Sequence, residues 1–253
     1  MKNRKNTSNS CDTDPYIVRN RILSTLSPEH FELLRPLLRR EKLKKNTIIN
    51  EANRPIDAMY FIESGIVSRI ARTSLDGAVE VAVVGQRGLI GISLLLESQN
   101  ALHRTIVQIE GEAFKAAAGD ITEFLNREPE IRRHFLQYVN ILIQQKAQVA
   151  LCNAKHELDM RLARWLMHAL DRIDGDELPI THDALASMLG VRRPGVSDAL
   201  ARLESRGIIV KARGTLKVLQ REALQNASCE CYRIIRDRYQ TQDMLPRFEH
   251  IWI

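Results

Sequence analysis

Several features are scarce in this sequence, and each scarcity excludes a class of protein. No run of about 18 or more apolar residues occurs, so we expect no transmembrane helix and no membrane partner. The N-terminus from Lys2 to Ser10 is polar and lacks the apolar core of a signal peptide, which predicts a cytoplasmic protein with a disordered segment over residues 1–15. Aromatic residues make up only 5% of the chain, so stacking platforms for single-stranded nucleic acid are not expected.

Cysteines and catalytic motifs are also few. The four cysteines, Cys11, Cys152, Cys229 and Cys231, do not make a disulfide scaffold in a chain of 253 residues. Cys229-x-Cys231 is closer than standard zinc-finger spacing and has no matching histidine pair, so we predict no metal and no cofactor. Redox regulation through these two cysteines is an alternative that rests only on their closeness. The sequence contains no P-loop, no G-x-S-x-G and no paired catalytic carboxylates in a recognisable setting, so we do not expect an enzyme.

What the sequence does contain is an excess of positive charge. The formal net charge is +6, which favours an anionic partner without distinguishing DNA from RNA or a membrane surface. Part of this charge is concentrated between Val191 and Arg221, where Lys and Arg greatly outnumber the two acidic residues, Asp198 and Glu204. A solvated helix face is the other interpretation. The run coincides with the motif described below, which favours an anionic partner.

The coarse pattern along the chain predicts an α+β protein. Residues 16–40 have apolar side chains at helical spacing, and Ser27-Pro28 is a good helix start. Residues 41–112 show short apolar runs separated by glycine turns, which is typical of a small antiparallel roll or barrel. Residues 120–153 are helical in pattern again.

This long predicted helix carries a candidate dimer interface. Its apolar residues fall near the a and d positions of a heptad, with a lysine in one slot, and such a stripe between two domains is a natural dimer seam. The alternative is that the stripe packs only on its own β-domain. The residues of the predicted dimer interface are Phe135, Val139, Leu142, Lys146 and Val149.

The strongest motif is a helix-turn-helix pattern over residues 181–207. Thr181 can cap a first helix, and Gly190 supplies a sharp turn that permits φ > 0. Pro194 fits the first turn of a second helix, where no N–H is needed. The second helix then has one buried stripe and one free, charged face. Its predicted buried residues are Val196, Leu200 and Leu203.

The motif predicts double-stranded DNA as the partner, because the second helix of a helix-turn-helix places its N-terminal residues against base edges in the major groove. Arg193 can pair bidentately with guanine, and Asp198 can accept from cytosine or position an arginine. Thr181, Arg192 and Arg202 are better placed for phosphates. A hairpin after the second helix, turning at Arg213-Gly214, looks like a wing that touches flanking backbone. The predicted DNA-binding residues are Thr181, Arg192, Arg193, Gly195, Ser197, Asp198, Arg202, Lys211 and Arg213.

The chain from about Ile17 to Leu219 resembles the CRP–FNR family of bacterial transcription regulators. Four stretches carry the resemblance: residues 56–65, Gly88-Leu-Ile-Gly91, residues 161–166 and the helix-turn-helix. The resemblance implies a homodimer that binds a palindromic operator and acts by contacting or blocking RNA polymerase. The division it implies is a disordered N-terminus (1–15), a cyclic-nucleotide-binding-like β-roll as sensor domain (16–125), a long dimerisation helix (126–153), a C-terminal winged helix-turn-helix (154–221) and a C-terminal extension (222–253).

The resemblance also implies an effector pocket, from which this sequence departs. Members that bind cAMP hold its phosphate on glycine-flanked N–H groups aided by an arginine, and Gly88, Gly91, Arg104 and Thr105 match that pattern. The position of the ribose-binding glutamate is Ile92, which cannot accept from a hydroxyl. We therefore predict a non-classical regulator that does not respond to cAMP and whose effector is unknown. The alternative is a cyclic-nucleotide-binding-like module acting on a protein partner.

Overall fold

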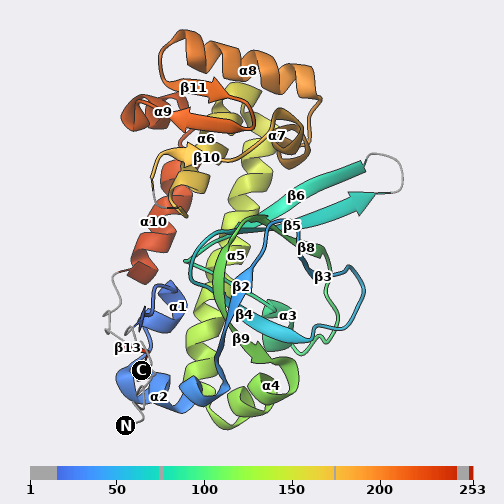
Figure 1. Ribbon diagram of the computed structural model, residues 1–253, viewed down its shortest axis with the longest axis vertical. Helices are drawn as coiled ribbons and strands as arrows, with labels where there is room; N and C mark the ends of the chain where they lie inside the picture. Colours follow the sequence, from blue (N-terminus) through green and yellow to red (C-terminus); the bar gives the residue numbers. More distant parts are fainter. Residues whose placement is uncertain (1–15, 74–76, 174, 244–250, 253) are drawn as a thin grey trace, which may run out of the picture.

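The computed structural model describes residues 16–73, 77–173, 175–243 and 251–252, so the segment predicted to be disordered, 1–15, lies outside the described residues. A β-roll occupies one end of the molecule, the helix-turn-helix occupies the other, and one long helix runs between them (Figure 1). No helix within these ranges is both long and apolar enough to cross a membrane.

A short helical region precedes the roll. Ser27 starts helix α2 as predicted, because its Oγ accepts a hydrogen bond from the His30 N–H at 3.2 Å and Pro28 occupies the first turn. This region comprises β1 (Tyr16–Ile17), α1 (Arg21–Ser24), α2 (Pro28–Leu34) and the 3-10 helix η1 (Arg35–Leu37), and β1 pairs with β13 (Ile251–Trp252).

The roll consists of two four-stranded antiparallel sheets, as the glycine-punctuated apolar runs predicted. The first sheet, in spatial order, is β2 (Arg39–Leu43), β9 (Gly111–Ala117), β4 (Ala58–Ile62) and β7 (Leu89–Ile90). The second is β3 (Ile48–Asn50), β8 (Arg104–Ile109), β5 (Ile66–Thr73) and β6 (Gly77–Val84). Apolar side chains fill the space between the sheets, and Ile62, Val67 and Val107 are fully buried there.

Helix α3 (Ile92–Leu95) follows β7, helix α4 (Ala118–Arg127) follows β9, and the long helix α5 (Pro129–Lys155) comes directly after α4. The sequence pattern predicted one helical segment from residue 120, but the structure divides it at Glu128-Pro129. Proline lacks a backbone N–H, so Pro129 starts a new helix instead of continuing α4. Helix α5 packs on the roll, with the Phe135 ring centroid 5.4 Å from that of Phe61.

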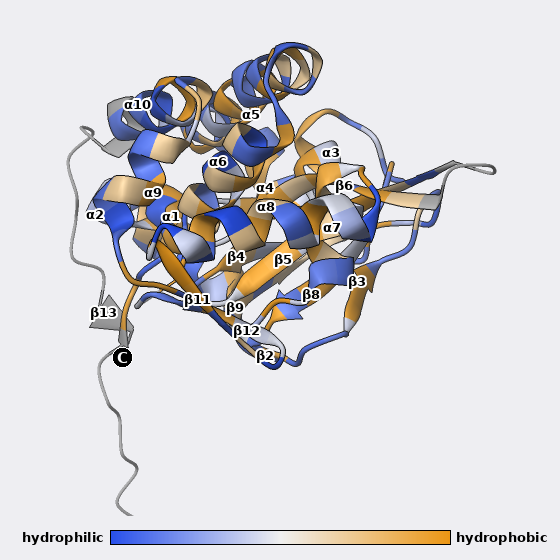
Figure 2. Cartoon of the chain, turned by 90° about the horizontal axis from the view of Figure 1, so that it is seen from above, coloured by the Kyte–Doolittle hydropathy of each residue, from blue (hydrophilic) through white to orange (hydrophobic). Residues whose placement is uncertain are grey.

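The other end of the molecule is a helical unit with a small sheet. It contains α6 (Leu158–Leu170), β10 (Glu177–Leu178), α7 (His182–Leu189), α8 (Arg193–Ser205), β11 (Ile209–Ala212), β12 (Thr215–Val218) and α9 (Arg221–Ala227). A single apolar core joins these elements, and Leu166, Leu200 and Leu224 are fully buried in it. In Figure 2 helix α8 alternates hydrophilic and hydrophobic stretches, as expected for a helix with one buried face.

The chain after α9 returns to the long helix. Helix α10 (Cys231–Asp243) packs against both α5 and α6, and Ile235 and Tyr239 are buried in the cluster that α5 shares with the roll. The Tyr239 hydroxyl donates to Gln145 Oε1 at 2.8 Å. The C-terminal extension therefore bridges the β-roll side of the molecule and the helix-turn-helix side.

Candidate functional site

The helix-turn-helix forms through the local signals found in the sequence. The Thr181 hydroxyl caps α7 by accepting from the Ala184 N–H at 3.2 Å. Gly190 ends α7 with φ of +64°, a left-handed conformation that glycine adopts without a Cβ penalty. The Val191 N–H then donates back to the Ala186 carbonyl at 3.0 Å, which fixes the turn into α8.

Helix α8 has the two faces that the sequence predicted. Pro194 lies in its first turn, and the predicted stripe is buried, with exposed fractions of 0% for Val196 and Leu200 and 3% for Leu203. The opposite face is open, and it carries the predicted DNA-binding residues Arg192, Arg193, Asp198 and Arg202. The two arginines that begin the helix lie where incoming anions would also meet its free N–H groups.

Ion pairs already hold some of these side chains in the free protein. Arg193 Nε lies 3.3 Å from Asp183, and both side chains are mostly exposed, so this pair is weak and can exchange for a base edge. Arg202 binds both oxygens of Asp159 at 2.6 Å, and the same hydrogen bonds lower the pKa of Asp159. Ser197 Oγ lies 2.8 Å from Nδ1 of His182, which ties the two helices of the motif together.

The predicted wing is present as the β11–β12 hairpin. Gly214 takes φ of +76° at its tip, next to the exposed Arg213. Lys211 Nζ pairs with Glu204 of α8 at 2.7 Å, so this lysine is partly committed to an internal contact. A groove runs between the wing and the N-terminal ends of α7 and α8. It is lined by Thr181, His182, Arg193, Lys211 and Arg213 among others.

Three of the predicted effector residues, Gly88, Gly91 and Ile92, lie on the side of the roll that α5 covers. Gly91 caps α3 with φ of +96°, and the following Ile92 packs into the apolar cluster that joins the roll to α5. Gly88 leaves room for α5: a Cβ there would lie 2.4 Å from the hydroxyl oxygen of Tyr138. Ile92 therefore has an apolar packing role, and Tyr138 covers the first glycine of the expected phosphate cradle.

The two remaining effector residues are engaged within the roll. Arg104 pairs with Glu51 at 2.9 Å. Thr105 is only 2% exposed, and it lies opposite Asn50 of β3 and Arg69 of β5 in the sheet register.

The predicted dimer seam is wrong for Phe135, Val139 and Leu142. Phe135, Val139 and Leu142 are 0%, 5% and 6% exposed, because they pack on the β-roll of their own chain. This is the alternative that the sequence left open. Val149 also packs against this cluster. Lys146 keeps exposed surface, although desolvation beside the second sheet, with Arg69 close by, lowers its pKa to about 8.

A second stripe on α5 is mostly exposed in the single chain, although Leu136 at its start also packs against the cluster that α5 shares with the roll. Ile143 and Leu151 are 63% and 50% exposed, which is high for large apolar side chains. Ile143 belongs to a row with alternating spacings of four and three residues, the period of a coiled-coil seam, and Leu151 lies next to Ala150 of that row. The stripe consists of Leu136, Asn140, Ile143, Ala147, Ala150, Leu151 and Ala154.

The β5–β6 hairpin reaches from the roll to the helix-turn-helix. Glu80 of β6 accepts hydrogen bonds from the Ser68 hydroxyl and, at 2.9 Å, from the Trp165 Nε1–H of α6. The Ser187 hydroxyl of α7 donates to the Ala78 carbonyl at 2.8 Å. Burial raises the pKa of Glu80 to about 7, although these hydrogen bonds and the nearby Lys146 oppose the change.

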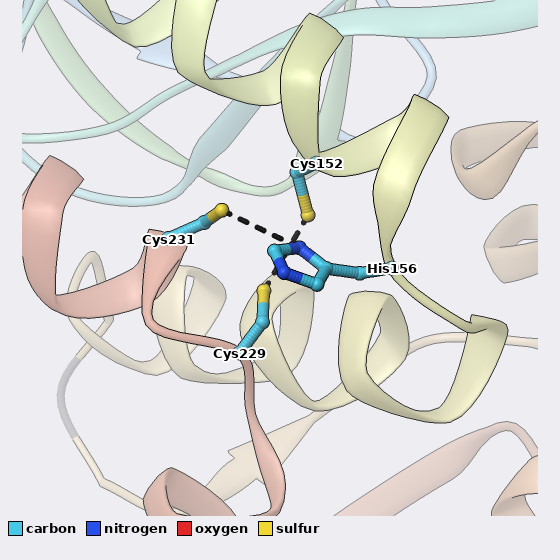
Figure 3. Close-up of side chains that lie close together, drawn as sticks. All are labelled: Cys152, His156, Cys229 and Cys231. Atoms are coloured by element: carbon cyan, nitrogen blue, oxygen red, sulfur yellow. Dashed lines mark hydrogen bonds between the residues drawn. The ribbon is translucent and has the colours of Figure 1, made fainter.

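The structure also brings together a group of side chains that sequence reasoning missed. Cys152, His156, Cys229 and Cys231 converge where α5 ends and α10 begins (Figure 3). Burial is the main cause that raises the pKa of Cys152, to about 12, and it raises that of Cys231 too. One signal was available: Cys152-x₃-His156 places two potential metal ligands one helical turn apart.

Comparisons with known proteins agree with this architecture. A model of the cyclic nucleotide-binding domain matches residues 40–128, and one of the Crp-like helix-turn-helix domain matches residues 160–227, so that together they cover more than half of the chain. No curated protein matches the sequence.

Solved structures share the fold at low identity. The c-di-GMP responsive global regulator CLP of Xanthomonas campestris is 18% identical with a TM-score of 0.62, and the match covers 76% of this chain and 99% of CLP. TTHB099, a CRP-family transcriptional regulator of Thermus thermophilus, is 18% identical with a TM-score of 0.64, covering 74% and 96%. FixK2 of Bradyrhizobium japonicum is 15% identical with a TM-score of 0.62, covering 76% and 98%.

The chain combines a β-roll, a long connecting helix and a winged helix-turn-helix whose second helix is exposed. Together with the two matching family models, this architecture defines a transcription regulator with a DNA-binding domain. The chain belongs to the CRP–FNR family of such regulators. Membership in this family agrees with the expectation that the chain is not an enzyme.

Proposed function

We propose that this regulator acts as a homodimer that reads a palindromic DNA site and does not respond to cAMP. DNA binding is supported by the open N-terminal end of α8, where Arg192 and Arg193 are exposed while the opposite face of the helix is buried. Such a helix end can enter the major groove, where bidentate arginine contacts to guanine distinguish base pairs.

The other predicted DNA contacts have supporting roles in this proposal. Phosphate contacts come from Thr181, Arg192 and the wing residue Arg213. Such contacts contribute to affinity and fix the register of the protein on the DNA, but they do not distinguish one base sequence from another. The part of α8 that would face the DNA major groove also carries Gly195, Ser197 and Asp198. Arg202 and Lys211 must first release Asp159 and Glu204, so we expect them to contribute less than Arg193.

Homodimerisation through the second stripe of α5 is the revised part of the proposal. Its alanines let two helices approach closely, Ile143 and Leu151 supply apolar area, and Asn140 is the kind of single polar residue that sets register in a coiled coil. A two-fold dimer reads a palindrome whose half-sites lie about one helical turn, roughly 34–36 Å, apart. RNA polymerase is the partner through which such binding would change transcription.

Insensitivity to cAMP follows from the apolar replacement at Ile92 and from Tyr138 lying over Gly88. Neither side chain offers the carboxylate that a ribose hydroxyl needs, and Tyr138 is buried. Isothermal titration of the full chain with cAMP should therefore give no binding heat. Saturable binding at micromolar cAMP would refute this part while leaving DNA binding untouched.

DNA reading is tested by paired arginine variants on a selected site. Arg193→Ala should weaken specific binding by about 1–3 kcal/mol and hardly change binding to random duplex. Arg206→Ala, at the exposed C-terminal end of the same helix, is the matched control and should lose less. Equal losses on specific and random DNA would make Arg193 a phosphate contact instead.

A further inference from the structure

The cluster of Cys152, His156, Cys229 and Cys231 has the chemistry of a metal site. Each residue offers one ligand atom, and all four ligand atoms lie within 4.8 Å of one another. The three cysteines are 0%, 6% and 0% exposed. Thiols and imidazole form the ligand set that tetrahedral structural zinc sites use, and Cys₃His is one of the known combinations.

The distances within the cluster fit one ion. For a tetrahedral zinc ion, Zn–S and Zn–N bonds of about 2.3 and 2.05 Å place two sulfurs about 3.8 Å apart and a sulfur and a nitrogen about 3.5 Å apart. The observed distance from Cys231 Sγ to His156 Nδ1 is 3.5 Å, and that from Cys152 Sγ to Cys229 Sγ is 3.4 Å. Four ligand atoms within 4.8 Å of one another could bind a single ion together and are too close to enclose a cluster of several metal atoms.

Two side chains beside the cluster, Gln148 and Arg164, favour the thiolates that metal binding needs and so oppose the effect of burial on the thiol pKa values. Gln148 Nε2 donates to Cys231 Sγ at 3.1 Å, an outer contact of the kind that orients metal ligands. Three thiolates and one neutral imidazole around Zn²⁺ carry a net charge of −1. The guanidinium of Arg164, only 6% exposed, acts electrostatically on Cys152, and its Nε has no hydrogen-bond partner among the described residues. Arg164 therefore supplies the compensating positive charge.

The cluster sits at a structural junction. Cys152 belongs to the last turn of α5, and His156 is the residue at which the chain leaves α5 before α6 begins. Cys229 follows α9, and Cys231 starts α10. An ion there would tie the end of the long helix to the C-terminal extension, right beside the connection between α5 and α6 (Figures 1 and 3).

We propose that Cys152, His156, Cys229 and Cys231 form a tetrahedral Zn²⁺ site that fixes the start of α10 to the junction between α5 and α6. With four protein ligands the site is closed, so the ion has a structural role and no position for a reacting water. On binding, the ion displaces one proton from each of the three thiols and takes a nitrogen lone pair of His156. The site is independent of the effector pocket and of the DNA-reading face.

The test measures metal content of the full chain purified under reducing conditions, by elemental mass spectrometry. The wild type should hold about one zinc ion per chain. Cys152→Ser and Cys231→Ser should lose it, whereas Cys11→Ser, the remaining cysteine, is the matched control and should retain it. His156→Asn should weaken retention against a chelator, and His30→Asn should not.

A spectroscopic measurement keeps the test decisive if a cysteine variant fails to fold. Wild-type protein reloaded with Co²⁺ should show the thiolate-to-metal charge-transfer and tetrahedral ligand-field bands of a sulfur-rich site, and zinc should displace them. Chelation should lower the thermal unfolding midpoint, because an ion that binds only the folded state stabilises it.

Three results would overturn the proposal: no zinc in the wild type together with no Co²⁺ spectrum, a Cys152–Cys229 disulfide found by peptide mapping in place of metal, or full zinc content in Cys152→Ser. Metal content is measured without DNA. Failure of this site and failure of the proposed DNA-binding function are therefore distinguishable.

Discussion

We predict that Glu80 makes the contact between the β-roll and the helix-turn-helix domain sensitive to pH. Its carboxyl accepts from Trp165 of α6 and lies against Ser68, in a setting that raises its pKa from 4.5 to about 7. The folded chain therefore binds this proton more tightly than the unfolded chain does. The stability that the contact contributes is fully present below about pH 4.5 and is lost as pH rises through about 7.

The size of the effect follows from the pKa difference. A change from 4.5 to about 7 corresponds to an upper limit of about 3.4 kcal/mol, and partial exposure of the side chain reduces this value. Glu80→Gln mimics the protonated carboxyl: its amide oxygen can accept from Trp165, and its NH₂ can donate to Ser68. Relative to the wild type, Glu80→Gln should gain stability steadily between pH 5 and pH 7.5.

The assay is urea unfolding of both proteins at fixed concentration, followed by fluorescence. The window between pH 5 and 7.5 avoids Lys146, whose pKa of about 8 makes it contribute mainly at higher pH. Parallel pH profiles for the wild type and Glu80→Gln would refute the reasoning, because the buried carboxyl would then not be the titrating group.

Two further predictions concern the long helix and the helix-turn-helix core. Ile143→Glu places a charge in the exposed stripe of α5 and should therefore give monomers in sedimentation velocity. The control Gln137→Glu, outside that stripe, should leave the dimer intact. A dimeric Ile143→Glu protein would contradict the revised seam. Leu200→Ala truncates a fully buried side chain in the core of the motif and should lower the free energy of unfolding by about 2–5 kcal/mol in denaturant titrations. The control is Ala201→Gly at the neighbouring exposed position. If Leu200→Ala lowered the free energy of unfolding less than this control, the core would not be packed as described.

The helix-turn-helix was predictable from sequence because its signals are local. Gly190 marks the turn, Pro194 marks the start of the second helix, and Thr181 caps the first, each through backbone geometry within a few residues. The roll was predictable as a class from its glycine-punctuated strands. The pairing order of its strands was not, because it depends on contacts between residues far apart in the sequence.

The dimer seam is the feature that the heptad pattern of the sequence did not locate correctly. Helix α5 has apolar residues on two faces, one through Phe135 and Leu142 and the other through Ile143 and Leu151. The heptad pattern in the sequence pointed only to the face through Phe135 and Leu142, and it could not say whether the β-roll or a partner covers that face. Only the packed structure, which buries the larger residues on the roll, leaves the second face for a partner.

The cysteine cluster was missed for a related reason. Cys152 and Cys229 are 77 residues apart in sequence, and the packing of α10 on α5 brings them together. Considered alone, Cys229-x-Cys231 has the wrong spacing for a zinc finger, and no motif search joins it to His156 at the end of another helix.

The central claim is that this chain is a dimeric regulator that reads a palindrome without cAMP. The most direct test selects bound sequences from a random duplex library, with and without cAMP, at near-physiological salt. The account predicts one enriched palindrome with half-sites about one helical turn apart, equally enriched in both conditions. Enrichment only with cAMP, or no enriched sequence in either condition, would contradict it.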